Sequence, residues 1–226
     1  MSAPRYTHAD RTYLRANYVT LEELCTGHDE DAVEIRRLID QGVLPRASYV
    51  VDGVGVFPVD YFRLYDDAGG CDRLRGLFAE RYRTAATPYP ELATDEALAE
   101  AWRAYLDGIW GQCLRAVTPE TIVRKQALVS SLCKLIALPR RRDADWQAQL
   151  RAEVTELNEI EREFAPDYDR AEEWNDRPPT RDLLIDVARE RFPDVFAHTA
   201  TDGRRARRAE TAARTEAATS SQKSGR

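Results

Sequence analysis

The sequence contains no long apolar run, and its few cysteines follow no disulfide or metal-binding pattern. Nothing in it approaches the roughly 20 consecutive apolar residues of a membrane helix, and its first residues lack the apolar segment of a secretion signal. Four cysteines are scattered without a Cys-x-x-Cys motif: Cys25, Cys71, Cys113 and Cys133. In a chain without a secretion signal, such cysteines indicate reduced, mostly buried thiols. We therefore expect a cytoplasmic protein with no membrane segment.

The sequence signatures of common enzymes are also missing. There is no glycine-rich phosphate loop, no dinucleotide-binding fingerprint and no nucleophile elbow. The three histidines lie far apart in polar or terminal segments, which argues against a histidine-based metal site. Four glutamates recur at helical spacing: Glu153, Glu156, Glu159 and Glu163. Because no Glu-x-x-His accompanies them, a solvated helix face is favoured over a carboxylate metal site. The sequence therefore assigns no catalytic residue, no metal and no cofactor.

Positive charge is scarce in the N-terminal part of the chain. Met1 to Asp67 contains seven Arg against twelve Asp or Glu, which is a net charge of −5, within a total of −6 for all 226 residues. Asp202 to Arg226 is the one net-basic segment, with seven basic and three acidic residues and a net charge of +4. That segment has no large apolar residues, so we predict a disordered basic tail over residues 201–226.

The stretch from Tyr18 to Phe62 begins with the signals of two short helices. Thr20 is followed three residues later by Glu23, which is the capping-box pattern at a helix start. A second helix is predicted from about Asp31 to Gln41. Gly42 then stands where a left-handed residue commonly ends a helix.

The same stretch continues with a hairpin signal. Two short apolar runs flank Asp52-Gly53, a dipeptide that favours a tight turn between antiparallel strands. Pro58 follows the second run, and proline is common at the first position of a helix. We therefore predict a β-hairpin and then a helix that starts at Pro58 and includes Tyr61 and Phe62.

These elements, joined by Gly42-Val-Leu-Pro45, resemble the MerR and excisionase type of winged helix-turn-helix. The resemblance implies a winged helix-turn-helix with a small β-hairpin wing in residues 1–66. An all-α helical domain is predicted over residues 67–200, so the fold class is mainly α.

The resemblance also implies a candidate nucleic-acid or partner face on the second helix. Arg36 and Arg37 lie on that helix, and Arg46 precedes the wing. Glu34 opposes DNA binding, because a carboxylate at this position would meet the phosphate backbone. The alternative is that Arg36 and Arg37 form a solvated face paired with Glu34 and Asp40.

Residues 67–200 show helical periodicity throughout. Thr94 is predicted to cap a long helix that extends to Leu114, with aromatic and aliphatic side chains on a wide face. Further helices are predicted after Thr118, Asp143 and Thr180.

Lys125 interrupts the apolar stripe of the helix that starts after Thr118. A lysine there must pair, reach water or lose its proton. One interpretation is a ligand or anion pocket formed by these residues: Lys125, Arg115, Trp110, Trp102 and Tyr105. The alternatives are a stem that runs along the core to water, a buried structural ion pair, and aromatic residues that only build the core.

Motifs along most of the chain resemble an uncharacterised bacterial family of natural product biosynthesis proteins. The matching segments are Tyr18–Leu24, Arg36–Ile39, Gly42–Pro45, Tyr61–Phe62, Cys113–Arg115, Thr118–Glu120, Lys125, Phe164–Pro166, Tyr168–Arg170, Arg181–Asp182 and Ile185–Asp186. The resemblance implies a gene beside biosynthetic genes and no established reaction.

Three functions therefore stay open. The first is a pathway protein whose winged helix binds a protein, peptide or small-molecule partner. The second is a DNA-binding regulator, which the acidic N-terminal part disfavours. The third is an enzyme with a pocket in the helical domain.

Overall fold

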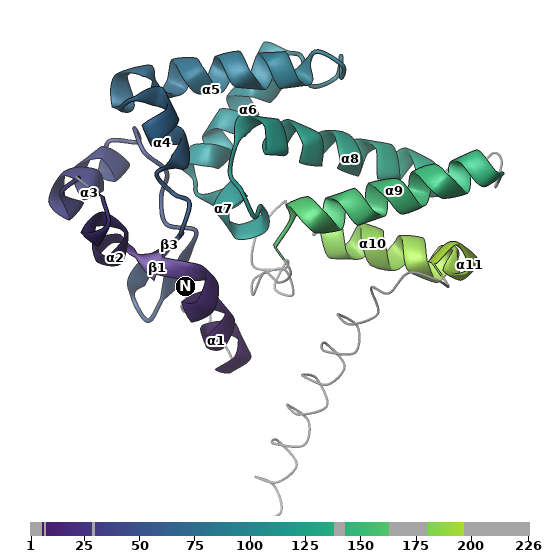
Figure 1. The fold of residues 1–226 in the computed structure, drawn as a ribbon, viewed down its shortest axis with the longest axis horizontal. Helices are drawn as coiled ribbons and strands as arrows, with labels where there is room; N and C mark the ends of the chain where they lie inside the picture. Colours follow the sequence, from purple (N-terminus) through teal and green to yellow (C-terminus); the bar gives the residue numbers. More distant parts are fainter. Residues whose placement is uncertain (1–5, 7, 29, 138–142, 163–179, 197–226) are drawn as a thin grey trace, which may run out of the picture. The chain divides into compact units, whose positions relative to one another are not determined.

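The computed structural model describes residues 6, 8–28, 30–137, 143–162 and 180–196. The chain divides into two compact units, Met1–Asp186 and Val187–Arg226. The described residues are mainly helical, with one small antiparallel sheet of three strands (Figure 1). This confirms the prediction of a mainly α fold. The predicted tail at 201–226 lies outside the described residues.

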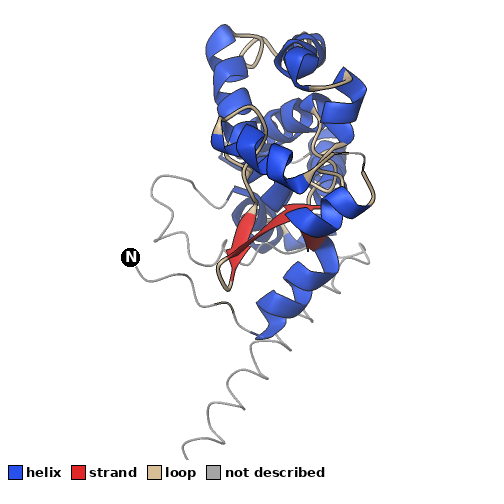
Figure 2. Cartoon of the chain, turned by 90° about the vertical axis from the view of Figure 1, so that its left-hand side faces the viewer, coloured by secondary structure: helices blue, strands red, loops and turns tan. Residues whose placement is uncertain are grey.

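The sheet consists of β1 (Tyr18–Thr20), β2 (Tyr49–Val51) and β3 (Val54–Pro58), coloured red in Figure 2. Its strand order is β1-β3-β2, and both pairings are antiparallel. The turn between β2 and β3 places Asp52 at φ 53° and Gly53 at φ 84°. Two successive left-handed residues are typical of a tight hairpin turn, so the predicted hairpin is confirmed.

The predicted helix start at Pro58 is wrong. Pro58 is the last residue of β3, where it lies opposite Tyr18 of β1. Proline is tolerated at a strand end because it cannot donate a ladder hydrogen bond. Tyr61 and Phe62 lie in the following turn, and the next helix, α4, spans Arg63–Ala68.

Helices α2 (Leu21–Thr26) and α3 (Ala32–Asp40) follow the sequence signals closely. The Glu23 amide donates to Thr20 Oγ1 at 3.2 Å, and the Thr20 amide donates to Glu23 Oε2 at 2.8 Å, which completes the capping box. Gly42 has φ 69°, in the left-handed region expected just after α3. An additional helix, α1 (His8–Asn17), precedes β1 and was not predicted.

The remaining helices are α5 (Cys71–Ala86), α6 (Asp95–Leu106), α7 (Ile109–Cys113), α8 (Pro119–Ala137), α9 (Ala144–Ile160), α10 (Thr180–Arg191) and α11 (Pro193–Phe196). α5 packs against α8, and α8 lies alongside α9 (Figure 1). The helical character predicted after residue 67 is confirmed for the described residues.

The predicted long helix from Thr94 to Leu114 is wrong, because it breaks at Gly108. This glycine has φ 73°, a conformation that side chains with a Cβ rarely adopt. A Cβ at Gly108 would also overlap the backbone carbonyl oxygen of Arg46. A tertiary contact therefore requires the turn between α6 and α7.

One hydrophobic core extends across the predicted boundary at residues 66–67. It includes Leu21 and Ile35 from the N-terminal elements and Phe78, Tyr105 and Ile122 from the later helices. A second, smaller cluster packs on β1 and β2 and consists of Tyr6, Leu14, Tyr18 and Tyr49. We call residues Tyr18–Ala68 the N-terminal module and residues Cys71–Arg162 the helical body.

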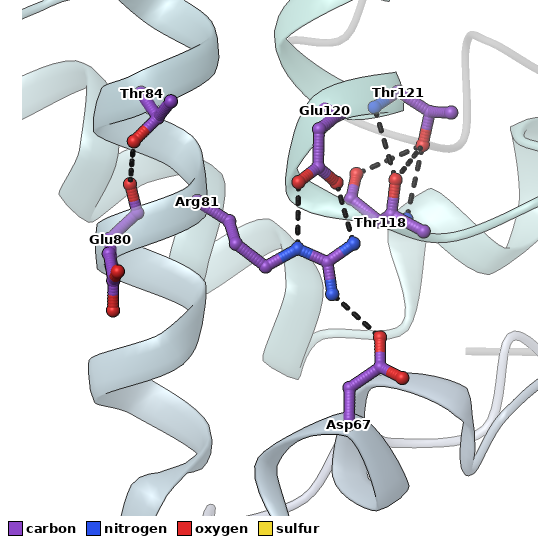
Figure 3. Close-up of polar contacts among 7 residues, drawn as sticks. All are labelled: Asp67, Glu80, Arg81, Thr84, Thr118, Glu120 and Thr121. Atoms are coloured by element: carbon purple, nitrogen blue, oxygen red, sulfur yellow. Dashed lines mark hydrogen bonds and ion pairs between the residues drawn. The ribbon is translucent and has the colours of Figure 1, made fainter.

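Arg81 on α5 connects the N-terminal module to the start of α8 (Figure 3). Its guanidinium donates to Asp67 Oδ2 at 2.6 Å and, through two nitrogens, to both Glu120 oxygens at 2.7 and 2.9 Å. Burial alone raises the pKa of Glu120, but the hydrogen bonds from Arg81 act in the opposite direction and the net pKa is below its ordinary value. Thr118 accepts a hydrogen bond from the Thr121 amide and so caps α8 (Figure 3).

The four cysteines are free thiols. Only Cys113 is buried, whereas Cys133 is exposed and Cys25 and Cys71 are half-buried. The prediction of reduced thiols agrees with this state, but the prediction that most are buried is wrong.

Candidate functional site

Lys125 forms a buried ion pair with Glu161. The Lys125 Nζ atom lies 2.7 Å from Glu161 Oε1, and the two side chains are 7% and 0% exposed. Lys125 is therefore almost entirely shielded from solvent. Of the three interpretations drawn from the sequence, the geometry matches the buried ion pair.

A short bridge between distant segments brings Glu161 to this position. Glu161 follows α9, and its backbone pairs antiparallel with Leu114, which follows α7. The Arg115 amide donates to the Ile160 carbonyl at 3.0 Å, and the Arg162 amide donates to the Cys113 carbonyl at 2.8 Å. No periodic pattern in the sequence marks this pairing, because it depends on how α7 and α9 meet.

The aromatic residues of the predicted pocket are only partly brought together around Lys125. The Lys125 ammonium lies 5.9 Å from the centre of the Trp110 ring, within the range of a cation–π contact. Trp102 and Tyr105 instead stack on each other, with ring centres 5.3 Å apart, and pack against Phe78. These two rings therefore belong to the hydrophobic core.

Arg115 also lies at the bridge, but in a different role from the predicted one. Its Nε atom donates to the backbone carbonyl oxygen of Glu161 at 2.8 Å. The residue is exposed. It therefore supports the backbone that carries Glu161.

A second buried charged group, which the sequence analysis missed, contacts the N-terminal module. Arg162 Nε donates to the Gly111 carbonyl at 3.2 Å, and its guanidinium lies 4.9 Å from the centre of the Tyr18 ring. Arg162 Nη2 is 3.7 Å from Asp60 Oδ1, and Asp60 Oδ2 accepts from the Val117 amide at 3.1 Å. The contact joins residues far apart in the chain, so no local motif could have identified it.

The segment 45–48 and the turn between α6 and α7 meet in a hydrogen-bonded seam. The Arg46 amide donates to the Leu106 carbonyl at 2.8 Å, and Ser48 Oγ donates to the Gly108 carbonyl at 3.0 Å. Gln112 Nε2 donates to the Ser48 carbonyl at 2.6 Å. These bonds, all accepted by backbone carbonyl oxygens, join the N-terminal module to the helical body.

A cavity of about 20 Å³ lies in this seam. Its lining residues come from both sides: Pro45, Arg46, Ser48, Pro58, Tyr61, Tyr105, Gly108, Gly111 and Val117. Of the predicted pocket residues only Tyr105 is among them. A cavity of this size has room for about one water molecule, and therefore not for a metabolite.

The arginines of α3, the helix predicted to carry a nucleic-acid or partner face, are paired with carboxylates. Arg36 Nη2 lies 2.6 Å from Glu22 Oε1, and Arg37 Nε donates to Glu34 Oε2 at 2.8 Å. The predicted Arg37–Glu34 pairing is therefore confirmed, whereas Arg36 pairs with Glu22 of α2. The hydrogen bond from Arg37 lowers the pKa of Glu34 below its ordinary value. Arg46 is exposed before β2.

The large apolar side chains that are exposed in the described part of the chain all belong to the N-terminal module. They are Val33, Val50, Val54 and Val59, with exposed fractions of 67%, 56%, 49% and 65%. Val33 lies on α3, near the paired arginines. The module therefore combines a carboxylate-rich surface with exposed aliphatic groups.

The glutamates of α9 pack partly against α8. Glu153 accepts from Ser131 Oγ at 2.8 Å, and Glu156 forms an ion pair with Arg124. Both glutamates are half-buried, so this face of α9 is only partly solvated. Glu159 is exposed, and Glu163 lies outside the described residues.

The described segments contain no metal-binding cluster and no membrane-spanning helix. Within these segments, no group of three or more His, Cys, Asp or Glu side chains has an arrangement that could hold a metal ion. None of the helices there combines the length and the hydropathy that a membrane span requires.

Comparison with known proteins gives one match. A family model described as a family of unknown function, DUF6058, matches residues 72–193, which include α5 to α9 and α10. No curated protein and no solved structure matches the chain.

Proposed function

The chain belongs to the DUF6058 family, a family of unknown function. Because the family gives no activity, we propose a function from the N-terminal module: the chain is an interaction protein. Its N-terminal module binds a segment of a partner protein and does not read DNA. The protein serves a pathway of natural product biosynthesis.

The order of elements in the N-terminal module supports a winged helix-turn-helix. β1 leads into the two short helices α2 and α3, and the β2–β3 hairpin then pairs back onto β1. In helix-turn-helix proteins the second helix is the recognition helix. In the proposed winged helix-turn-helix, α3 is the recognition helix and the hairpin is the wing.

The negative charge of the N-terminal module, together with the pairing of the α3 arginines, supports the proposal that the partner is not DNA. Arg36 and Arg37 already have Glu22 and Glu34 as partners. Exposed ion pairs are individually weak, so the net charge of the module decides whether phosphate can displace them. Residues Tyr18–Ala68 contain four Arg against eleven Asp or Glu, a net charge of −7. Such a surface repels a polyanion.

The same surface indicates the chemistry of the partner. Val33 is 67% exposed on α3, with Glu34 next to it in the chain and the N-cap residue Asp31 two residues before it. Aliphatic contacts at the centre of an interface and complementary charges around them favour specific binding. The partner segment therefore carries aliphatic side chains together with Lys or Arg.

The DNA part of the proposal is tested by titrating the full chain into labelled duplex DNA at physiological salt. We expect only non-specific binding, in the range of about 10⁻⁴ to 10⁻⁶ M. Arg63→Ala is the matched control, because Arg63 is an exposed arginine outside α3. Arg36→Ala should weaken DNA binding no more than this control does. Nanomolar, sequence-dependent binding that Arg36→Ala abolishes would show instead that the protein is a DNA-binding regulator.

The partner part is tested by selecting displayed random peptides on the full chain. We expect peptides rich in aliphatic and basic residues, and Val33→Asp should weaken their binding by about tenfold or more, as loss of a central interface residue does. Val59→Asp is the matched control, because Val59 is 65% exposed and the change adds the same charge outside α3. Selection of acidic peptides, or binding that is insensitive to Val33→Asp, would contradict the proposed face.

The assignment to natural product biosynthesis is supported by the motif resemblance alone, for example at Gly42–Pro45 and Thr118–Glu120. Deleting the gene in its host and profiling the secreted metabolites tests it. We expect the loss of a specific product. An unchanged profile under conditions in which the neighbouring biosynthetic genes are expressed would contradict the assignment.

An enzymatic role for the helical body has less support. The charged group that the sequence marked, Lys125, is held by Glu161, and the seam cavity accommodates about one water molecule. Neither feature provides room for a substrate.

A further inference from the structure

Tyr105 places a polar atom in the interior without a protein partner. Its side chain is 4% exposed, and within the described residues its hydroxyl has no hydrogen-bond partner. A buried hydroxyl that loses its hydrogen bonds to water is costly unless another group replaces them. Burial also raises the pKa of Tyr105, so the phenol is neutral and keeps its proton available for donation.

The cavity that Tyr105 lines also has polar residues in its wall. Its lining residues include Ser48, whose hydroxyl donates to the Gly108 carbonyl, and Pro45, whose carbonyl accepts from Tyr61. Each carbonyl oxygen has a second lone pair, and a serine hydroxyl can accept as well as donate. A water molecule beside these groups therefore finds acceptors in addition to the Tyr105 hydroxyl, which can donate to it.

The cavity also has the right size. Its volume of about 20 Å³ exceeds the roughly 10–15 Å³ that one water molecule requires. Apolar cavities stay dry, but a roomy site with two to four polar partners is normally hydrated. The exposed residue Arg46 is part of the lining, so the cavity has a route to solvent.

We propose that this cavity is a binding site for one ordered water molecule, which hydrogen-bonds to the Tyr105 hydroxyl and to polar groups of segment 45–48. The water is shared by the N-terminal module and the helical body. It supplies the partner that Tyr105 otherwise lacks, and it adds a bridge to the hydrogen-bonded seam. This site is separate from the α3 face and does not depend on the proposed partner.

Two measurements on the full chain test the site. A crystal structure at a resolution that shows ordered solvent should contain one water within hydrogen-bond distance of Tyr105 Oη. Tyr105→Phe should lower the melting temperature, because it removes one partner of that water. Tyr61→Phe is the positive control, since Tyr61 lines the same cavity and its hydroxyl donates directly to the Pro45 carbonyl at 2.7 Å.

The sign of the Tyr105→Phe effect is decisive. If no water occupies the cavity, the hydroxyl is an unsatisfied buried group, and its removal stabilises the protein. An empty cavity, or a Tyr105→Phe protein that melts at the same temperature as the parent or higher, would overturn the proposal. Both variants keep the aromatic ring in the core, so a loss of folding is not expected to obscure the result.

Discussion

Replacing Lys125 with methionine removes a buried ammonium while keeping most of its apolar stem. The partner, Glu161, has a fully buried side chain and lies 2.7 Å away. In Lys125→Met the Glu161 carboxylate would stay buried without the opposite charge that compensates it. Deleting one member of a buried pair typically costs about 3–5 kcal/mol. At about 2–4 °C per kcal/mol for a chain of this length, the melting temperature should fall by about 6–20 °C.

Urea denaturation followed by tryptophan fluorescence measures this loss, because Trp110 lies next to the pair. Lys134→Met is the matched control on the same helix. The Lys134 side chain is 74% exposed, and its Nζ atom lies as far as 3.8 Å from Oε1 of its partner, Glu91. A substitution at such a surface position should change the free energy of unfolding by at most about 0.5 kcal/mol.

The double variant Lys125→Met with Glu161→Gln separates the ion pair from simple packing loss. Removing both charges leaves no uncompensated ion, so the double variant should lose clearly less stability than the two single variants added together. A Lys125→Met protein as stable as the parent, or strictly additive losses, would refute the conclusion that a buried structural pair holds Glu161 against α8.

Two further predictions concern the joints between elements. Gly111→Ala should destabilise the protein by about 1–3 kcal/mol, because its Cβ would overlap the buried Ser48 hydroxyl. Gly76→Ala, within α5 and with no atom nearby, should instead stabilise it by about 0.5–1 kcal/mol, and urea denaturation of both variants checks the opposite signs. Because the folded pKa of Glu120 lies below its ordinary value of 4.5, its contribution to stability is present above pH 4.5 and is lost as the pH falls through the lower folded pKa. Arg81→Ala should remove that part of the acid sensitivity in melting curves recorded from pH 7 to pH 3, and an unchanged pH dependence would contradict the role of Arg81.

The sequence determined the features that depend on neighbours in the chain. The capping box needs only Thr20 and Glu23, and the hairpin turn needs only Asp52 and Gly53. The left-handed end of α3 at Gly42 is equally local. Such signals can be predicted because the hydrogen bonds and backbone angles involved span only a few residues.

For Lys125, the sequence predicted the burial of the charge but not the residue that pairs with it. Its place in an apolar stripe correctly marked it as a buried charge that needs a partner. The identity of that partner, Glu161, could not be predicted, because it depends on the backbone pairing of the segments after α7 and α9. The same holds for Arg162 and Asp60, which belong to different segments.

Only the tertiary structure decided where some helices and strands end and where distant segments meet. Gly108 ends α6 because the turn packs against the carbonyl of Arg46, and Pro58 ends a strand because β1 pairs beside it. The cavity lined by Tyr105 likewise forms only because segment 45–48 and the α6–α7 turn meet. Local propensity sets helices and turns, but the free energy that selects between alternatives at these points comes from contacts between residues far apart in the chain.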